Sequence, residues 1–479
     1  MPKPRVTSAP GPWRWSPFGS LPELRRDPLG TLLQARSTYG DVVKFRSGFW
    51  FAYLLSHPED IQHVLQDNNQ NYAKGFVFEY LKPVLGRGLL TNGGESWRRQ
   101  RRLVQPAFQH QRLGDLTDVM TSAVEQMLDS WRLETDTRPV DLTQEMTGLT
   151  LEIVTRALLG SNFGSNGGAV SNAVGVAQEH INWRITHLLG LSDRFPTDRN
   201  RQFKRALAVL NTAVYSIIDE RRRAIETRDV VQRRASAPGR REPSLAGEAD
   251  GTSNDLLTLL LEARDPETGE GMTEIQLRDE VMTIFLAGHE TTANALVWAW
   301  HLLALNPEVE ERLHCEVDRV LDGRPPGLAD LAQLEYTRMV FDEALRLRPP
   351  VWAIFRCPLA DDAAGGHRIP AYASVILSPY VTHLHPEFWD KPARFDPERF
   401  RPERVAARPK YAYFPFGGGP RMCIGSEFAV MEGVLALASI AREFRLRPIP
   451  GHVVALEPLI TLRPFGGLPM LVQRRDDRR

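Results

Sequence analysis

The sequence predicts a mainly α protein with a minor β region, and three observations support this class. Apolar residues recur at helical spacing along most of the chain, and one such pattern continues from Thr273 to Leu305. Stretches with β character are few and short. The expected helices cover residues 60–66, 116–133, 144–159, 201–225, 255–262, 273–305 and 427–444. The expected strands cover residues 42–45, 50–55 and 375–377, with a late group between 453 and 472.

Composition and charge exclude several classes of protein. The 479 residues carry 59 basic and 59 acidic side chains, so the net charge gives no reason to expect nucleic acid or an anionic membrane as partner. The cysteines, Cys315, Cys357 and Cys423, lie far apart, which argues against a disulfide framework and favours a reducing, cytoplasmic compartment. The N-terminal residues lack the apolar run of a signal peptide or a membrane span.

We expect a single domain over residues 1–479. Prolines make residues 1–20 an irregular arm laid over the surface. Residues 229–253 are rich in Arg, Ala, Pro, Gly and Ser and have few large apolar side chains, which predicts a flexible, solvated loop. Its arginines suggest an acidic partner, but a charged mobile loop is the simpler interpretation.

The long central helix has a defined start, a defined end and an unusual middle. Thr273 and Gln276 form a T-x-x-Q capping box, and Asn306-Pro307 ends the pattern. The middle reads AGHETT, where Ala287, Gly288 and Thr291 share one face. Two small residues there leave room for something other than a side chain. In the alternative interpretation, threonine hydroxyls bond to carbonyls one turn earlier and relieve a bend.

Cys423 stands in the stretch FPFGGGPRMCIG, directly before an expected helix. The glycines allow a tight loop whose amides turn toward one point. A helix N-terminus and Arg421 both favour a thiolate over a thiol. Such a thiolate suits a nucleophile, a redox sensor or a metal ligand. No further zinc ligands are evident nearby and a histidine base cannot be paired from sequence, whereas haem needs a single protein thiolate.

Five motifs, in order along the chain, resemble those of the cytochrome P450 superfamily of haem-thiolate monooxygenases. Phe416, Gly419, Arg421, Cys423 and Gly425 fit its haem-binding loop, F-x-x-G-x-R-x-C-x-G. The other four are the W-x-x-x-R of Trp97 and Arg101, the AGHETT of 287–292, the E-x-x-R of Glu343 and Arg346, and the PERF of 397–400. Each motif is weak alone, but together they span most of the chain.

The resemblance implies a cytochrome P450 fold, with haem b (iron protoporphyrin IX) between the long central helix and the cysteine loop. It implies that Cys423 is the axial iron ligand, that Phe416 shields the sulfur, and that Gly425, Ala287 and Gly288 lie at the haem. Trp97, Arg101, Arg421 and Arg356 resemble the family's propionate partners, since buried carboxylates need paired cations. Glu343, Arg346 and Arg399 resemble a structural ion network.

Glu290 and Thr291 resemble the family's acid–alcohol pair, which delivers protons to dioxygen during its activation. The resemblance therefore implies that Glu290 and Thr291 are the catalytic residues of a monooxygenase, which uses O₂ and electrons from a separate donor. The pair argues against an isomerase, a dehydratase or a peroxygenase, and a non-catalytic haem-binding protein would have no need of it. We expect ferredoxin and ferredoxin reductase, or a flavodoxin-type donor, as electron source. Arg98, Arg99, Arg102 and Lys410 would form a basic patch for an acidic ferredoxin, and the alternative interpretation is that they are ordinary solvated side chains.

The resemblance also places the substrate pocket, and the residues that would line it are mostly large and apolar. We expect an apolar small molecule such as a fatty acid, terpenoid, steroid or polyketide, bound by a monomer. The expected lining residues are Phe76, Phe78, Trp183, Phe285, Ala287, Trp352, Ile354 and Phe465.

Overall fold

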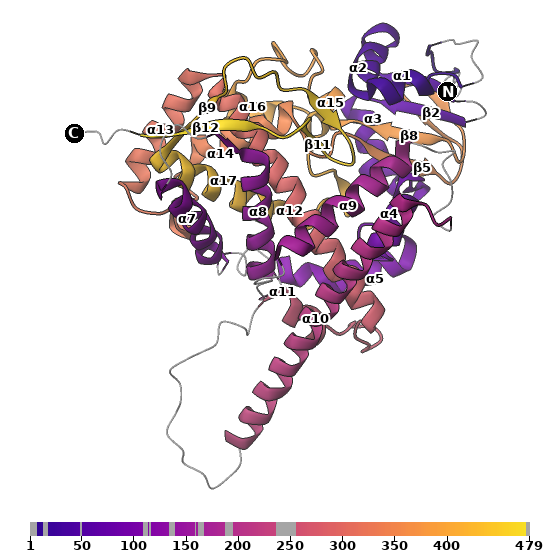
Figure 1. The fold of residues 1–479 in the computed structure, drawn as a ribbon. Helices are drawn as coiled ribbons and strands as arrows, with labels where there is room; N and C mark the ends of the chain where they lie inside the picture. Colours follow the sequence, from indigo (N-terminus) through magenta and orange to yellow (C-terminus); the bar gives the residue numbers. More distant parts are fainter. Residues whose placement is uncertain are drawn as a thin grey trace. The chain divides into compact units, whose positions relative to one another are not determined.

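The computed structural model of the chain (Figure 1) describes residues 7–12, 18–47, 50–108, 114, 116–133, 139–158, 160, 167–186, 195–235 and 255–475. They divide into two compact units. The first unit holds residues 1–78, 120–149 and 290–479, and the second holds residues 79–119 and 150–289. The single domain expected from the sequence stays a prediction.

The boundaries between the units fall inside long helices, so each of these helices contributes residues to both units. The helices concerned are α4 (Val77–Leu85), α7 (Thr117–Leu133), α8 (Leu142–Ile153) and α12 (Glu274–Ala304). The start of α12 is a capping box: the Thr273 amide donates to Gln276 Oε1 at 2.9 Å, and the Gln276 amide donates to Thr273 Oγ1 at 3.3 Å. Pro307 occupies the first turn of the next helix and cannot continue α12.

The first unit contains the described strands, and its largest sheet has five strands in the order β1-β2-β8-β5-β3. β2 and β8 are parallel, with Tyr53 opposite Val375, and the other neighbours are antiparallel. β4-β12-β9 form a three-stranded sheet, and β6-β7 and β10-β11 form hairpins. The strands are β1 (Val42–Ser47), β2 (Trp50–Leu55), β3 (Tyr72–Lys74), β4 (Pro139–Asp141), β5 (Ile354–Pro358), β6 (Asp362–Ala364), β7 (His367–Ile369), β8 (Ser374–Leu377), β9 (Phe444–Pro448), β10 (Leu456–Pro458), β11 (Leu462–Pro464) and β12 (Pro469–Arg474).

The first unit also contains helices that lie wholly within it. They are α1 (Leu21–Arg26), α2 (Pro28–Tyr39), α3 (Pro58–Gln62), η1 (His63–Asp67), η2 (Asn69–Asn71), α13 (Pro307–Leu321), η6 (Leu328–Asp330), α14 (Glu335–Leu347), α15 (Pro379–Thr382), η7 (Pro397–Phe400), α16 (Pro402–Ala407), η8 (Lys410–Ala412), η9 (Gly419–Arg421) and α17 (Ser426–Glu443). The described part of the N-terminal arm lies on this unit, where Thr7 bridges to His367 and the Pro10 carbonyl accepts the Lys44 amide at 2.7 Å.

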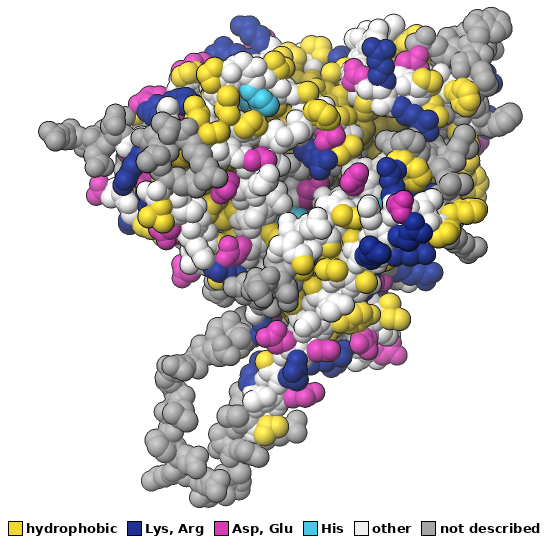
Figure 2. All heavy atoms as spheres, viewed as in Figure 1, with side chains coloured by type: hydrophobic (Ala, Val, Ile, Leu, Met, Phe, Trp, Pro, Cys, Tyr) yellow, Lys and Arg dark blue, Asp and Glu magenta, His cyan; other side chains and the backbone are white. Residues whose placement is uncertain are grey.

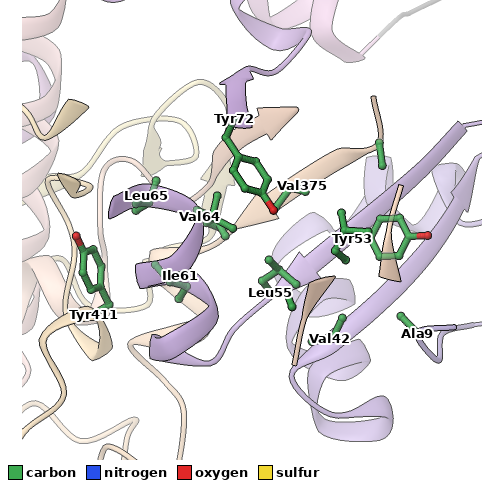
Figure 3. Packing of buried hydrophobic residues seen from close by; sticks show 14 of the residues in the cluster. Ala9, Val42, Tyr53, Leu55, Ile61, Val64, Leu65, Tyr72, Val375 and Tyr411 are labelled. Carbon is green, nitrogen blue, oxygen red and sulfur yellow. The ribbon is translucent and has the colours of Figure 1, made fainter. Parts of the chain in front are cut away.

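One apolar cluster of this unit joins the sheet to the loop before Cys423 (Figure 3). Tyr53, Leu55 and Val375 come from the sheet, and Ile61, Val64 and Leu65 come from α3 and η1. Tyr411 and Phe414 complete the cluster. The cysteine loop therefore starts from residues that are packed into a core.

The second unit is helical in its described residues. Its elements are α5 (Gly94–Val104), η3 (Gln105–Phe108), η4 (Val154–Leu158), α9 (Gly167–Thr186), α10 (Asp198–Ala235) and α11 (Leu256–Glu262). α9 and α10 lie side by side (Figure 1). Asp255 caps the N-terminus of α11, and its carboxylate accepts the Thr258 amide at 2.8 Å.

The structure confirms the expected helices and strands and corrects one segment. α10 continues to Ala235, so residues 229–235 are helical and not part of a loop. This stretch, DVVQRRA, contains no glycine or proline, and arginine, glutamine and alanine are good helix formers. Residues 236–253 of the expected loop lie outside the described residues. The sequence analysis also missed α2, α9 and α13.

Charge and hydropathy agree with the composition. Basic and acidic side chains are interspersed over the face in Figure 2, as the balanced net charge predicts. None of the helices among the described residues combines the length and the apolar run that a membrane crossing needs.

Candidate active site

The cysteine loop, residues 414–425, is held closely against its neighbours in the first unit. Gly419 has a φ of 64°, which favours glycine, and a Cβ there would overlap the carbonyl oxygen of Leu65. The Gly419 amide donates to the Tyr411 hydroxyl at 3.1 Å, and the Cys423 amide donates to the Phe416 carbonyl at 2.9 Å. Cys423 itself is exposed and precedes the first residue of α17 by three positions. The glycines thus fix the backbone that presents the thiol.

Glu343, Arg346 and Arg399 come together as the sequence analysis expected. Glu343 and Arg346 of α14 are fully buried, with Nε to Oε2 at 2.6 Å and Nη2 to Oε1 at 2.7 Å. Arg399 Nε lies 3.4 Å from Glu343 Oε1. Arg346 also donates to the carbonyls of His383, Pro392 and Arg394 at 2.8, 2.8 and 3.1 Å. One guanidinium therefore fixes two separate stretches of loop.

His383 connects this ion network to the cysteine loop. Its Nε2 accepts the backbone N–H of Phe414 at 3.0 Å, so the ring proton is on Nδ1, which donates to the Arg346 carbonyl at 3.2 Å. Burial, and then the positive charge of Arg346, lower the pKa of His383 to about 3. The ring is therefore neutral at physiological pH and can keep accepting from Phe414.

Arg356 is a buried cation that lies near Arg421, a partly buried cation of the cysteine loop. Arg356 is 7% exposed, and its guanidinium donates to the neighbouring Phe355 carbonyl at 3.0 Å. Burial, and then the positive charge of Arg421, lower the pKa of Arg356 to about 10. No carboxylate of the described residues forms an ion pair with Arg356. A buried cation such as Arg356 favours an anionic ligand, because a buried charge needs a compensating one.

In the second unit, α12 packs closely against η4 at Gly288. A Cβ on Gly288 would come within 2.9 Å of Val154 Cγ2 on η4, so contact with a side chain accounts for this glycine. Thr150 Oγ1 donates to the His289 carbonyl at 2.9 Å. Burial lowers the pKa of His289, whose Nδ1 lies 2.8 Å from the Phe285 carbonyl, so the ring is neutral. Ala287 is exposed.

In the first unit, Glu290 meets a residue from the far end of the chain. The Thr461 hydroxyl donates to Glu290 Oε1 at 2.7 Å. Burial of the carboxyl raises the pKa of Glu290, while the Thr461 hydrogen bond and the charge of Arg463 act in the opposite direction. Thr291 is partly buried and Thr292 is buried. The next position along this face of α12 is Asn294, whose Nδ2 donates to the same threonine at 3.2 Å.

Trp97 and Arg101 lie one turn apart on α5 of the second unit, where Trp97 is 8% exposed. The helix is positioned by Gln100, which donates to the Arg87 carbonyl and accepts from Asn92 Nδ2, both at 2.8 Å. The Arg87 amide in turn donates to an Asp279 carboxylate oxygen of α12 at 2.7 Å. α5 is thus tied to the first half of the long helix.

The arginines expected to form a basic patch are paired with acids of the same unit. Arg98 pairs with Glu95 one turn earlier on α5. Arg99 and Arg102 lie 3.4 and 3.3 Å from Asp265 Oδ2. Arg102 also lies 3.1 Å from Glu267. Their charge is therefore largely compensated within the protein. Lys410 lies over the ring of Tyr411, 5.6 Å from its centroid.

The expected pocket residues are distributed over both units. In the first unit, Phe465 is 66% exposed and Phe76 is 44% exposed, with an edge-to-face contact to Phe355. Phe78 lies under Lys74, and Ile354 packs against the cluster of Figure 3.

Trp352 donates to the Leu459 carbonyl at 2.8 Å and packs in two core clusters. In the second unit, Phe285 is 1% exposed and Trp183 lies under Arg199. Trp352 and Phe285 thus have structural partners of their own.

Sequence reasoning missed three residues that the structure places at the site: His383, Asn294 and Thr461. His383 and Thr461 meet their partners across 31 and 171 positions of the chain, which no local pattern records. Asn294 gave the only usable signal, because it follows Glu290 by four positions and shares its helix face.

Comparison with known proteins identifies the family. A model of the cytochrome P450 family matches residues 9–461. The chain is 39% identical to cyclooctatin synthase of Streptomyces melanosporofaciens, over 98% of this chain and 96% of that protein. It is 36% identical to cyclooctat-9-en-7-ol 5-monooxygenase of the same organism, over 98% of both chains. It is 34% identical to pentalenene oxygenase of Streptomyces avermitilis, over 92% of this chain and 90% of the other. With its motifs in family order and its match over nearly the whole length, this chain belongs to the cytochrome P450 family and is an oxidoreductase of the monooxygenase type.

Proposed function

We propose that the chain is a haem b monooxygenase whose axial ligand is Cys423 and whose substrate is a terpenoid hydrocarbon or monoalcohol. The family binds haem through a cysteine thiolate, and Cys423 is the cysteine in the matching motif. The observation that carries the proposal is that one unit holds an exposed Cys423 on a closely packed loop, together with the buried cation Arg356 and the neighbouring cation Arg421. When bound, haem supplies the reduction of O₂ and the transfer of one oxygen atom to substrate.

The residues of the chain would hold the haem and deliver protons. The loop glycines and His383 hold the backbone of the cysteine loop, and Glu343 with Arg346 holds His383. Arg356 and Arg421 would neutralise the propionates, joined by Trp97 and Arg101. Glu290 has the chemistry of a proton relay, since it is a carboxyl group whose pKa is raised by burial. Thr291, next to it, would orient the proton acceptor.

The substrate class comes from the relatives. Two of them are named for oxygenation of cyclooctat-9-en-7-ol and of pentalenene, which are terpenoids. An unsaturated monoalcohol and a hydrocarbon offer few polar groups for recognition. Large apolar residues of the chain, such as Phe76 and Phe465, suit such a molecule.

A binding screen tests the substrate proposal. Terpenoid hydrocarbons and monoalcohols would be titrated into the purified protein beside a fatty acid, a steroid and a polyketide of similar size, and the spin-state change of the haem recorded. The proposal expects the terpenoids to give the tightest and most complete change. Turnover under ¹⁸O₂ should then place one labelled oxygen atom in the product. Tighter binding of the fatty acid, steroid or polyketide would reject the terpenoid class.

The electron donor is proposed as a ferredoxin with its reductase. Since Arg98, Arg99 and Arg102 are compensated by acids of their own unit, they do not by themselves favour an acidic partner. Rates of haem reduction by a ferredoxin and by a flavodoxin, measured over a range of ionic strength, would decide between the two donors.

A further inference from the structure

Thr461 sits in a turn whose backbone is fixed on both sides. The turn joins β10 to β11 in the first unit. The Leu459 carbonyl accepts Trp352 Nε1 at 2.8 Å, and the Leu462 carbonyl accepts Trp298 Nε1 at 2.9 Å. Thr461 is 4% exposed. Because hydrogen bonds from two indole groups hold the residues around it, the position of Thr461 in the turn is fixed.

The turn lies along one face of α12. Glu290, Asn294 and Trp298 are spaced by four residues, so they stand above one another on the helix. All three bond to the β10–β11 turn: Glu290 and Asn294 to the Thr461 side chain, and Trp298 to the Leu462 carbonyl. These hydrogen bonds therefore fix the position of the half of α12 that starts at Glu290 relative to the β10–β11 connection, over two turns of the helix.

The hydrogen bonds of Thr461 have a defined direction. A threonine hydroxyl has one hydrogen to donate and lone pairs to accept with. Asn294 Nδ2 donates to Oγ1, so the hydroxyl hydrogen remains for Glu290 Oε1, at the short distance of 2.7 Å. Asn294 thus orients the hydroxyl, and the hydroxyl holds one oxygen of the Glu290 carboxyl group.

We propose that Thr461, oriented by Asn294, is a positioning residue for proton delivery by Glu290. The inference rests on the proposed function, in which Glu290 is the proton relay beside Thr291. Thr461 fixes the orientation of the Glu290 carboxyl group. Each proton that Glu290 passes on toward Thr291 therefore starts from the same position, and a proton from solvent replaces it. A relay held in place by a fixed donor needs no reorganisation when the proton moves.

The same contact opposes the effect of burial on the pKa of Glu290. A hydroxyl that donates to a carboxylate stabilises the ionised form, against the effect of burial. The other charge acting on Glu290 is Arg463 on β11, which is paired with Glu457 on β10 at 2.8 Å. Loss of the Thr461 hydroxyl would leave Arg463 alone to oppose burial and would raise the pKa of Glu290.

The test compares Thr461→Val, which removes the hydroxyl at nearly constant volume, with Thr461→Ser, which keeps it. Product formed per NADPH should fall about tenfold in T461V, a fraction of the roughly 100- to 10,000-fold that a positioned general acid contributes. Peroxide should rise correspondingly, and the basic limb of the pH profile for coupling should move to higher pH. T461S should show the wild-type coupling and the wild-type pH profile. Infrared spectra of the resting protein give a readout without turnover: the carboxyl band that Glu290→Gln removes should shift in T461V and not in T461S.

Controls separate this inference from the proposed function. Thr121→Val removes another buried threonine hydroxyl of the same unit, which donates to the Pro326 carbonyl at 3.0 Å, and should leave coupling unchanged. If E290Q uncouples the enzyme while T461V keeps the wild-type coupling and carboxyl band, the positioning role is wrong and the function stands. If E290Q itself couples normally, the relay assigned to Glu290 is wrong. Equal losses in T461V, T461S and T121V would mean a general packing defect and would also overturn the inference.

Discussion

Removing the Glu343 side chain should cost the protein its fold around the haem rather than its chemistry. Glu343→Ala removes both hydrogen bonds to Arg346, the ion pair with Arg399 and the bond that Glu343 Oε1 accepts from the Asp396 amide at 2.8 Å. Arg346 is fully buried and keeps its donors on the carbonyls of the neighbouring loops. Its charge, however, loses the carboxylate that compensates it.

The magnitude follows from that stranded charge. Breaking a buried ion pair by removing one partner costs about 3–5 kcal/mol. A typical folding stability is about 5–15 kcal/mol, so the loss is a large share of the total. An exposed pair behaves differently: Arg368 and Asp361 lie 2.6 Å apart at 64% and 54% exposure, and Arg368→Ala should cost less than about 1 kcal/mol.

The assay is the haem-to-protein ratio and the melting temperature of Glu343→Ala, Arg368→Ala and Thr291→Ala, expressed side by side. Glu343→Ala should give little soluble, haem-loaded protein, because the uncompensated charge of Arg346 destabilises the core that, through His383, holds the segment that starts at Phe414. The other two variants should express normally. A stable, haem-replete Glu343→Ala protein that has lost turnover would refute the structural role and move this pair into catalysis or electron transfer.

Three further outcomes are expected. Cys423→Ala should lose the far-red-shifted Soret band of the reduced carbon monoxide adduct, and a variant that kept the band would exclude Cys423 as ligand. Thr291→Ala keeps a good helix former, so haem content should survive while product per NADPH falls and peroxide rises; an unchanged yield would remove Thr291 from the mechanism. A hydrogen bond from His385 holds the pKa of Asp41 at about 2, below the ordinary 3.8, so Asp41 stabilises the fold above pH 3.8 and this contribution is lost as the pH falls toward 2. Urea unfolding should show Asp41→Asn less stable than wild type by up to about 2 kcal/mol at pH 6, with the gap closing toward pH 2, and a gap independent of pH would contradict the assignment.

The sequence by itself determined the class of fold and the family motifs from which the site residues are proposed. The capping box of Thr273 and Gln276 and the stop at Pro307 placed α12 to within a residue at each end. Such signals act between residues three or four positions apart, which helix geometry brings together whatever the rest of the chain does. The order of residues in the cysteine loop was equally readable, because the glycines that the backbone needs are next to the cysteine they serve.

Only the tertiary structure decided what those residues touch. Gly288 proved to face Val154, Arg99 and Arg102 proved to be paired with Asp265, and Glu290 proved to be held by Thr461. Each of these partners lies more than a hundred positions away in the sequence. The residues around Thr461 in the sequence do not indicate that its hydroxyl bonds to Glu290, since this contact depends on how whole helices and sheets pack. The protonation of Glu290 is set in the same way, by burial and by neighbours that the fold brings from distant parts of the chain.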